Sequence, residues 1–260
     1  VNPSDLVSAS GEVEDLTIGM INSRKLSVRS VVTLCVKAEE LYDEEVTIGI
    51  HAGESVEYRR SVVDIAQILI HKKDIFRLRE EFPLPANYPN IFQILWSNLM
   101  LDDVELRPME GKLSLQGELK VQLIYETIDN TIHSFETLIP FSGNLECHGC
   151  REGMIPSISY CLGQQELVIR PDKDGEERMI ALEALMELKL KLYEEAKVEL
   201  IRDVYGVKNE VMVKEKEVLL QKLLAKTTGK QKVTEHVRID ASNSSILQLL
   251  HSEGKVLLDK

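Results

Sequence analysis

Apolar and polar side chains alternate along residues 113–125. The odd positions are apolar except at Gly117, and the even positions are polar as far as Gln122. A period of two turns one set of side chains into a core and the other toward water, which is typical of a half-buried antiparallel strand. Gly117 predicts a bulge or a sharp bend within this strand.

A second strand is predicted to follow directly. Asp129 and Asn130 are turn-forming residues. Residues 131–141 then return, ending near Pro140, and would complete a β-hairpin. The centre of the chain is therefore expected to be an antiparallel sheet.

The chain also repeats itself internally. A shift by 155 residues places residues 80–95 on residues 235–250 without a gap. A second window, at a shift of 154, places the apolar residues of 26–36 on those of 180–190. In the first window, identical residues occur at Glu80, Ala86, Ile91, Gln93 and Leu95.

The repeat suggests how the chain is organised. The first copy covers residues 23–105, the intervening segment 106–177 and the second copy 178–260. The expected units are a loose tail at 1–20, a partial unit at 21–75, a complete unit at 76–206 and the truncated start of the next unit at 207–260. Because the second copy stops where the first continues into its strongest strand, we expect the native chain to run on past Lys260.

Residues 178–193 carry conflicting signals. Their Leu, Glu, Lys and Ala content favours a helix by propensity. Their apolar residues nevertheless alternate, and the equivalent residues 26–36 are rich in β-branched valine. Since equivalent segments should share one conformation, we predict strands at both places. Residues 56–70 and 211–228 fit a strand or a helix equally well.

One short helix is predicted at residues 88–97. Pro89 suits a first helical turn, and Ile91, Ile94 and Leu95 would share one face. The second copy would form the same helix, with its apolar face at Ile246, Leu249 and Leu250. The expected fold class is mainly β, with antiparallel sheets or sandwich units that each carry one short helix. An α+β fold is the alternative.

Composition excludes several classes of function. The net charge is −12, and such a surface repels nucleic-acid phosphates and anionic membranes. No apolar run reaches the roughly 20 residues that a membrane-spanning helix needs. The sequence has no nucleophile-elbow, phosphate-loop or dinucleotide-binding motif. We therefore expect a protein that is not an enzyme and has no cofactor.

Cys147 and Cys150 form the one match to a chemical motif, a CxxC pair. Such a pair can serve in redox chemistry or supply half of a zinc site, with His148 and Cys161 as possible further ligands. A redox pair, however, is usually placed at a helix N-terminus, and a second CxxC is missing from the sequence. A loop with free thiols is the alternative interpretation, and we expect no bound metal.

Tyr88, Phe92, Trp96 and Met100 would form an apolar ridge beside the core face of the predicted helix. Such a ridge belongs either to the core or to a partner-docking surface. In the second copy, three of the four equivalent residues are polar, and a core position would resist that change. The equivalent residues are Asn243, Leu247, His251 and Lys255.

Residues 82–141, around this ridge, contain the strings FPLP, IFQIL, GKLSLQGEL, LIY and IPF. In these strings the chain resembles the SPOCS domain of spore coat-assembly proteins. The arrangement is similar to that of the clostridial coat morphogenetic proteins that combine SPOCS units with a LysM domain. No LysM-like segment is found in these 260 residues, so no binding residue is carried over.

The resemblance implies a non-catalytic scaffold in spore coat or envelope assembly. It implies a location at the forespore surface, inside the mother cell, and partners among other coat morphogenetic proteins or further copies of the chain. A small-ligand or glycan-binding module of the cell envelope is the first alternative, although aromatic residues make up only 5% of the chain. A zinc or redox protein built on Cys147 and Cys150 is the second.

Overall fold

A computed structural model describes residues 6–40, 43–51, 56–208, 210–227, 232–234, 236 and 249–252. Within these residues the chain forms eight strands and no helix. The strands are β1 Leu6–Asn22, β2 Lys25–Glu39, β3 Val56–Pro83, β4 Gln93–Met109, β5 Lys112–Glu126, β6 Ile132–Glu146, β7 Ile155–Pro171 and β8 Glu177–Gly206. The prediction of a mainly β protein built from antiparallel sheets is confirmed.

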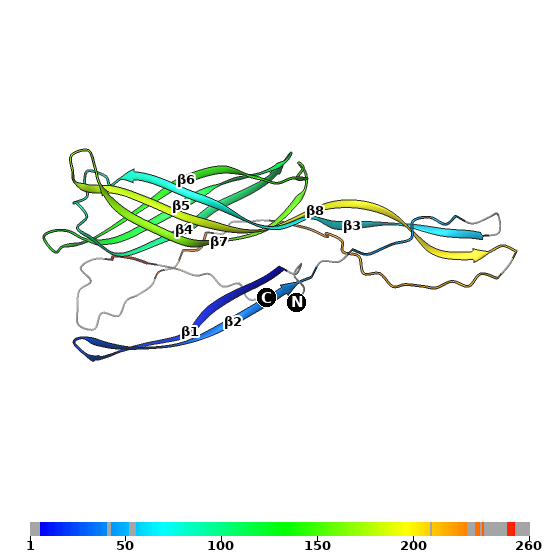
Figure 1. Cartoon of the computed structure of the whole chain (residues 1–260), viewed down its shortest axis with the longest axis horizontal. Coiled ribbons are helices and arrows are strands. Elements are labelled where there is room, and N and C mark those ends of the chain that lie inside the picture. The colour runs from blue at the N-terminus through cyan, green and yellow to red at the C-terminus, as the bar shows by residue number, and fades with distance from the viewer. Residues whose placement is uncertain are drawn as a thin grey trace. The chain divides into compact units, whose positions relative to one another are not determined.

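The chain divides into two compact units. The first comprises Val1–Ser61 and Leu200–Val218, and the second comprises Val62–Glu199 and Leu219–Lys260. The first unit contains the two-stranded antiparallel sheet β1–β2. The second contains the three-stranded sheet β4–β5–β6 and most of the three-stranded sheet β3–β8–β7 (Figure 1).

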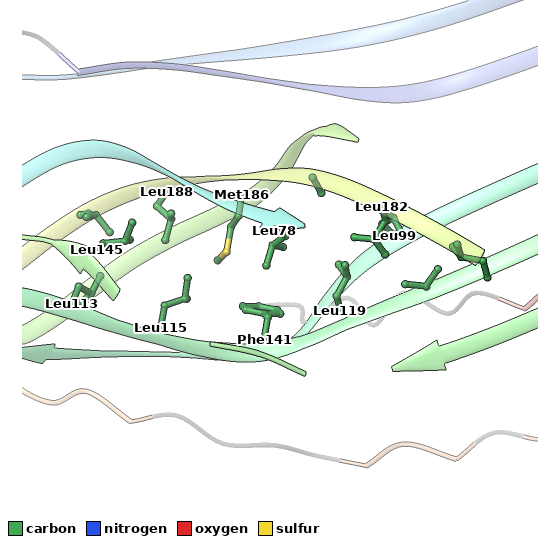
Figure 2. Packing of buried hydrophobic residues seen from close by; sticks show 14 of the residues in the cluster. Leu78, Leu99, Leu113, Leu115, Leu119, Phe141, Leu145, Leu182, Met186 and Leu188 are labelled. Carbon is green, nitrogen blue, oxygen red and sulfur yellow. The ribbon is translucent and has the colours of Figure 1, made fainter. Parts of the chain in front are cut away.

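Two apolar sheet faces form the core of the second unit. The odd residues of β5 from Leu113 to Tyr125 are buried, except for Gly117. The even residues of β8 from Ile180 to Leu192 are buried in the same cluster. Figure 2 shows Met186 and Leu188 of β8 pointing toward the side chains of β5. Because each sheet has one apolar face, stacking the two sheets removes both faces from water.

The strands that alternation predicts are confirmed. Residues 113–125 lie in β5, residues 131–141 contribute to β6, and residues 178–193 lie in β8 despite their helical propensity. Residues 26–36 lie in β2. Of the two ambiguous segments, residues 56–70 belong to β3, whereas residues 211–227 form neither helix nor strand.

The helix predicted at residues 88–97 is wrong, because β4 begins at Gln93. A single turn bond, from the N–H of Tyr88 to the carbonyl of Pro85, precedes this region, and the next backbone N–H groups bond to other strands. Ile91 donates to the carbonyl of Glu177, and Phe92 donates to the carbonyl of Glu126. A helix of two or three turns is marginal in water, so pairing with β5 and β8 decides the conformation. The equivalent helix of the second copy lies largely outside the described residues.

The N-terminal segment also differs from expectation. Residues 6–22, of which residues 6–20 were expected to be part of a loose tail, form β1 and pair antiparallel with β2 along their whole length. The backbone hydrogen bonds to β2 hold these residues in a strand, although their own sequence pattern did not predict one. The boundaries of the predicted repeat units remain predictions.

The irregularity predicted at Gly117 lies on the neighbouring strand. The pairing of β5 with β6 is continuous through Gly117, whereas β4 bulges between Asp102 and Glu105, opposite this glycine. Asp103 in the bulge has a positive φ of 48°. A Cβ atom at Gly117 would lie 2.7 Å from Cζ of Phe141 and 3.2 Å from Cα of Val104. Glycine is therefore required here so that two neighbouring strands can approach closely.

We predict that Gly117→Ala lowers the free energy of unfolding by about 1–3 kcal/mol, because the added methyl group overpacks a rigid contact. Urea denaturation followed by circular dichroism measures the change. Gly19→Ala in β1 is the matched control, because no atom lies within 4 Å of its added Cβ. Phe141→Leu should recover part of the loss in the double variant. Equal stability of the Gly117→Ala and Gly19→Ala chains would contradict this role for Gly117.

Candidate docking surface

The four residues of the predicted ridge do not share one surface. Tyr88 packs on the core side, where its ring meets Phe135 edge-on at a centroid distance of 5.2 Å. Phe92 is 65% exposed just before β4. Trp96 and Met100 lie on the face of β4 that points away from β8. Without a helix, side chains four residues apart on a strand are separated by about 13 Å.

A bulge in β4 determines which side chains face outward. Ile94 pairs with Tyr125 and Trp96 pairs with Ile124, so Leu95 is an extra residue between two regular pairs. The bulge reverses the alternation, and both Ile94 and Leu99 therefore reach the core. Leu95 is left 46% exposed.

Three large apolar side chains that are close in the sequence, Phe92, Leu95 and Trp96, are exposed, and we call them the Trp96 patch. They are 65%, 46% and 36% exposed, respectively. Leu95 was assigned by its sequence pattern to the core face of a helix. No local signal distinguishes a bulged strand from a helical turn here, because both place Ile91 and Ile94 inside. The patch offers a partner three large apolar side chains within five residues of chain.

The outer face beside Trp96 carries a connected polar group. Nε2 of Gln122 donates to Oε2 of Glu136 at 2.7 Å, and Lys120 pairs with Oε1 of Glu136 at 2.8 Å. The hydrogen bond from Lys120, with a smaller contribution from that of Gln122, lowers the pKa of the Glu136 carboxyl group. This carboxylate therefore stays charged at neutral pH and holds both neighbours in place.

Gln122 is buried although it lies on the outward face of β5. Within the described part of the chain, no group donates a hydrogen bond to its Oε1 atom. The side chain lines a hollow of about 200 Å³ together with Trp96, Glu136 and residues 249–252. The rings of Trp96 and His251 lie 4.4 Å apart. This hollow is smaller than the roughly 300–1,000 Å³ of typical small-molecule sites.

The CxxC pair occupies a tight turn. The N–H of Cys150 donates to the carbonyl of Cys147 at 2.9 Å, and Gly149 has the positive φ that such a turn needs. Two further backbone hydrogen bonds tie the turn to Gly111. Both cysteines are free and only 1% exposed.

The environment of the pair does not favour thiolate chemistry. Burial, followed by the neighbouring Cys150, raises the pKa of the Cys147 thiol. A thiol with a raised pKa is a poor nucleophile and a poor metal ligand until it loses its proton. Among the described residues, no three His, Cys, Asp or Glu side chains gather as they would around a metal ion. The contacts support a packing role for the pair.

Comparison with protein families yields a match within the second unit. The family model described as "SipL, SPOCS domain" matches residues 90–164, which comprise β4, β5, β6 and the first part of β7. No curated protein and no solved structure matches the chain. In the described part of the chain, none of the elements is a helix long and apolar enough to cross a membrane.

We predict that the four cysteines react with a thiol reagent in two classes. Cys35 and Cys161 are exposed and should react promptly, whereas Cys147 and Cys150 should react at least about 100-fold more slowly because the turn must open first. Mass spectrometry of the native chain over time measures the order. All four thiols should react alike in denaturant. Prompt reaction of Cys147 in the native chain would contradict the packing role.

Proposed function

Because residues 90–164 form a SPOCS domain, which associates the chain with sporulation, we propose that it is a non-catalytic scaffold in assembly of the spore coat or envelope. Its partners would be other coat morphogenetic proteins, with further copies of the chain as a second possibility. The place of action would be the forespore surface, inside the mother cell. The Trp96 patch is the observation that carries this proposal.

The composition of the patch supports protein recognition. Tryptophan contributes more than most residues to the binding energy of protein interfaces, and exposed clusters of large apolar side chains often mark such interfaces. Trp96 and Leu95 lie within strand β4, so the sheet holds their backbone in place and presents them with little loss of conformational entropy on binding. The acidic groups of the surface would then select among partners by charge.

The connected polar side chains beside the patch also support protein recognition. Glu136 is held by Lys120 and Gln122 and presents a fixed carboxylate next to the apolar side chains. The buried Oε1 atom of Gln122 could accept a hydrogen bond from a partner that enters the hollow. An apolar anchor with a polar rim is the usual composition of a protein interface.

We predict that a pull-down from sporulating cells with this chain recovers identified coat morphogenetic proteins. The variant Phe92→Ala/Trp96→Ala should recover them at least about tenfold less well, because truncation of interface anchors costs about 2 kcal/mol or more. Quantitative mass spectrometry of the captured proteins provides the measurement.

Tyr160→Ala is the matched control, because it removes an aromatic side chain of similar exposure from β7, in the other sheet. Circular dichroism must show that all variants remain folded. Equal capture by the control and the double variant would exclude the Trp96 patch as the docking surface. Recovery of no coat protein by the unchanged chain would argue against the scaffold itself.

A further inference from the structure

The hairpin β1–β2 has one apolar face and one polar face. On one face, Leu26, Val28, Val32, Leu34 and Val36 of β2 stand beside Met20, Ile18, Val13, Gly11 and Ala9 of β1. The opposite face carries polar side chains such as Ser27, Arg29 and Thr33, although Val31 and Cys35 also lie on it. A ribbon with such alternation is expected to bury its apolar face.

In this structure the apolar face is exposed. Leu34 is 73% exposed and Met20 is 77% exposed. The other large apolar side chains of this face are also exposed, namely Val7, Val13, Leu16, Ile18, Leu26, Val28, Val32 and Val36. A contiguous apolar face of this kind is typical of an interface that lacks its partner.

The hairpin β7–β8 has the same pairing, position by position. Leu26 pairs with Met20, and its equivalent Ile180 pairs with Ile169. Val28 pairs with Ile18, as Leu182 pairs with Leu167. One constant offset for each strand, 154 for β2 and 149 for β1, also relates Leu34 and Gly11 to the pair of Leu188 and Tyr160.

The two hairpins also share an irregularity. In β1–β2 the register shifts directly after the pair of Val13 and Val32. In β7–β8 it shifts directly after the pair of Leu162 and Met186, which is the equivalent pair under the same two offsets. A bulge is a specific feature of a sheet, and its placement at equivalent positions indicates that the hairpins are two copies of one element.

The copy in the second unit shows what this element packs against. The side chains of Ile180, Leu182, Met186, Leu188 and Leu190 are all at most 2% exposed. They share one buried cluster with the inner residues of the β4–β5–β6 sheet (Figure 2). That sheet is therefore already covered by its own closing hairpin and is not available to β1–β2.

We propose that β1–β2 is the closing hairpin of a further SPOCS unit. Its apolar face is a docking surface for the inner face of a three-stranded antiparallel sheet like β4–β5–β6, supplied by that other unit. This surface is distinct from the Trp96 patch, and the inference does not depend on the proposed scaffold function. The chain would thus join at least two SPOCS units, with β1–β2 completing one and residues 62–199 forming the core of the other.

A chimaeric chain tests the proposal directly, because the protein's own β4–β5–β6 sheet can stand in for the missing one. Residues 156–192 are replaced by residues 7–38, which preserves every pair between the strands. A control chimaera carries residues 8–37 instead. Because Ser8 pairs with Lys37, the two strands keep their register, and the shift by one residue turns the polar face inward. Amide hydrogen exchange in β5 then reports whether the sheet is covered.

The in-register chimaera should keep the amides of β5 at least about 100-fold better protected than the shifted chimaera does. Protection in the in-register chimaera that is no better than in the control would overturn the proposal.

Dye binding to the otherwise unchanged chain provides a second test, which does not depend on whether the chimaeras fold. The variant Val28→Lys/Leu34→Lys should bind an environment-sensitive apolar dye several-fold less than the wild type. Ser27→Lys/Thr33→Lys, on the opposite face, should not reduce dye binding. No difference between these variants would mean that the apolar face is covered, which also overturns the proposal. If the chain forms a submicromolar dimer that only Val28→Lys/Leu34→Lys abolishes, a second copy of the chain covers the apolar face. That result would also overturn the proposal.

Discussion

The structure of the second unit depends on the packing of β5 against β8. β5 is the central strand of one sheet and β8 the central strand of the other, and each buries one face, in β8 over residues 180–192. Burial of apolar area contributes about 25 cal/mol per Å², so the two facing rows of apolar side chains provide the main stabilisation. The sheets cannot slide by one residue without turning a polar row into the core. The register of every neighbouring strand follows from that constraint.

This packing determines which side chains remain available for a partner. Once the odd residues of β5 face β8, the outer face of the sheet must carry Gln122, Ile124 and the outward residues of β4 and β6. The bulge at Leu95 allows Ile94 and Leu99 to serve the core while Trp96 faces outward. The same rule explains β1–β2, which has the apolar face of a closing hairpin without a sheet to cover.

Period-two alternation predicted β5 and β8, the central strands of the core, although the composition of β8 favours a helix. It failed where pairing between distant strands decides the conformation. Residues 88–97 fit a helical pattern because the bulge at Leu95 imitates a spacing of three and four. β1 has little pattern that distinguishes it from a tail, and only its pairing with β2 reveals it. Of the predicted site residues, Trp96 and Phe92 lie in the exposed patch, Tyr88 packs into the core, and Leu95 was not foreseen.

The packing of β5 against β8 is best tested by native-state hydrogen exchange of the whole chain. If β5 and β8 form one cooperative core, their slowest amides should open with the same free energy, equal to that of global unfolding. The amides of β1 and β2 should exchange much faster, because an isolated two-stranded ribbon is marginal in water. Slow exchange confined to β5, with β8 opening independently at a much lower free energy, would contradict the account.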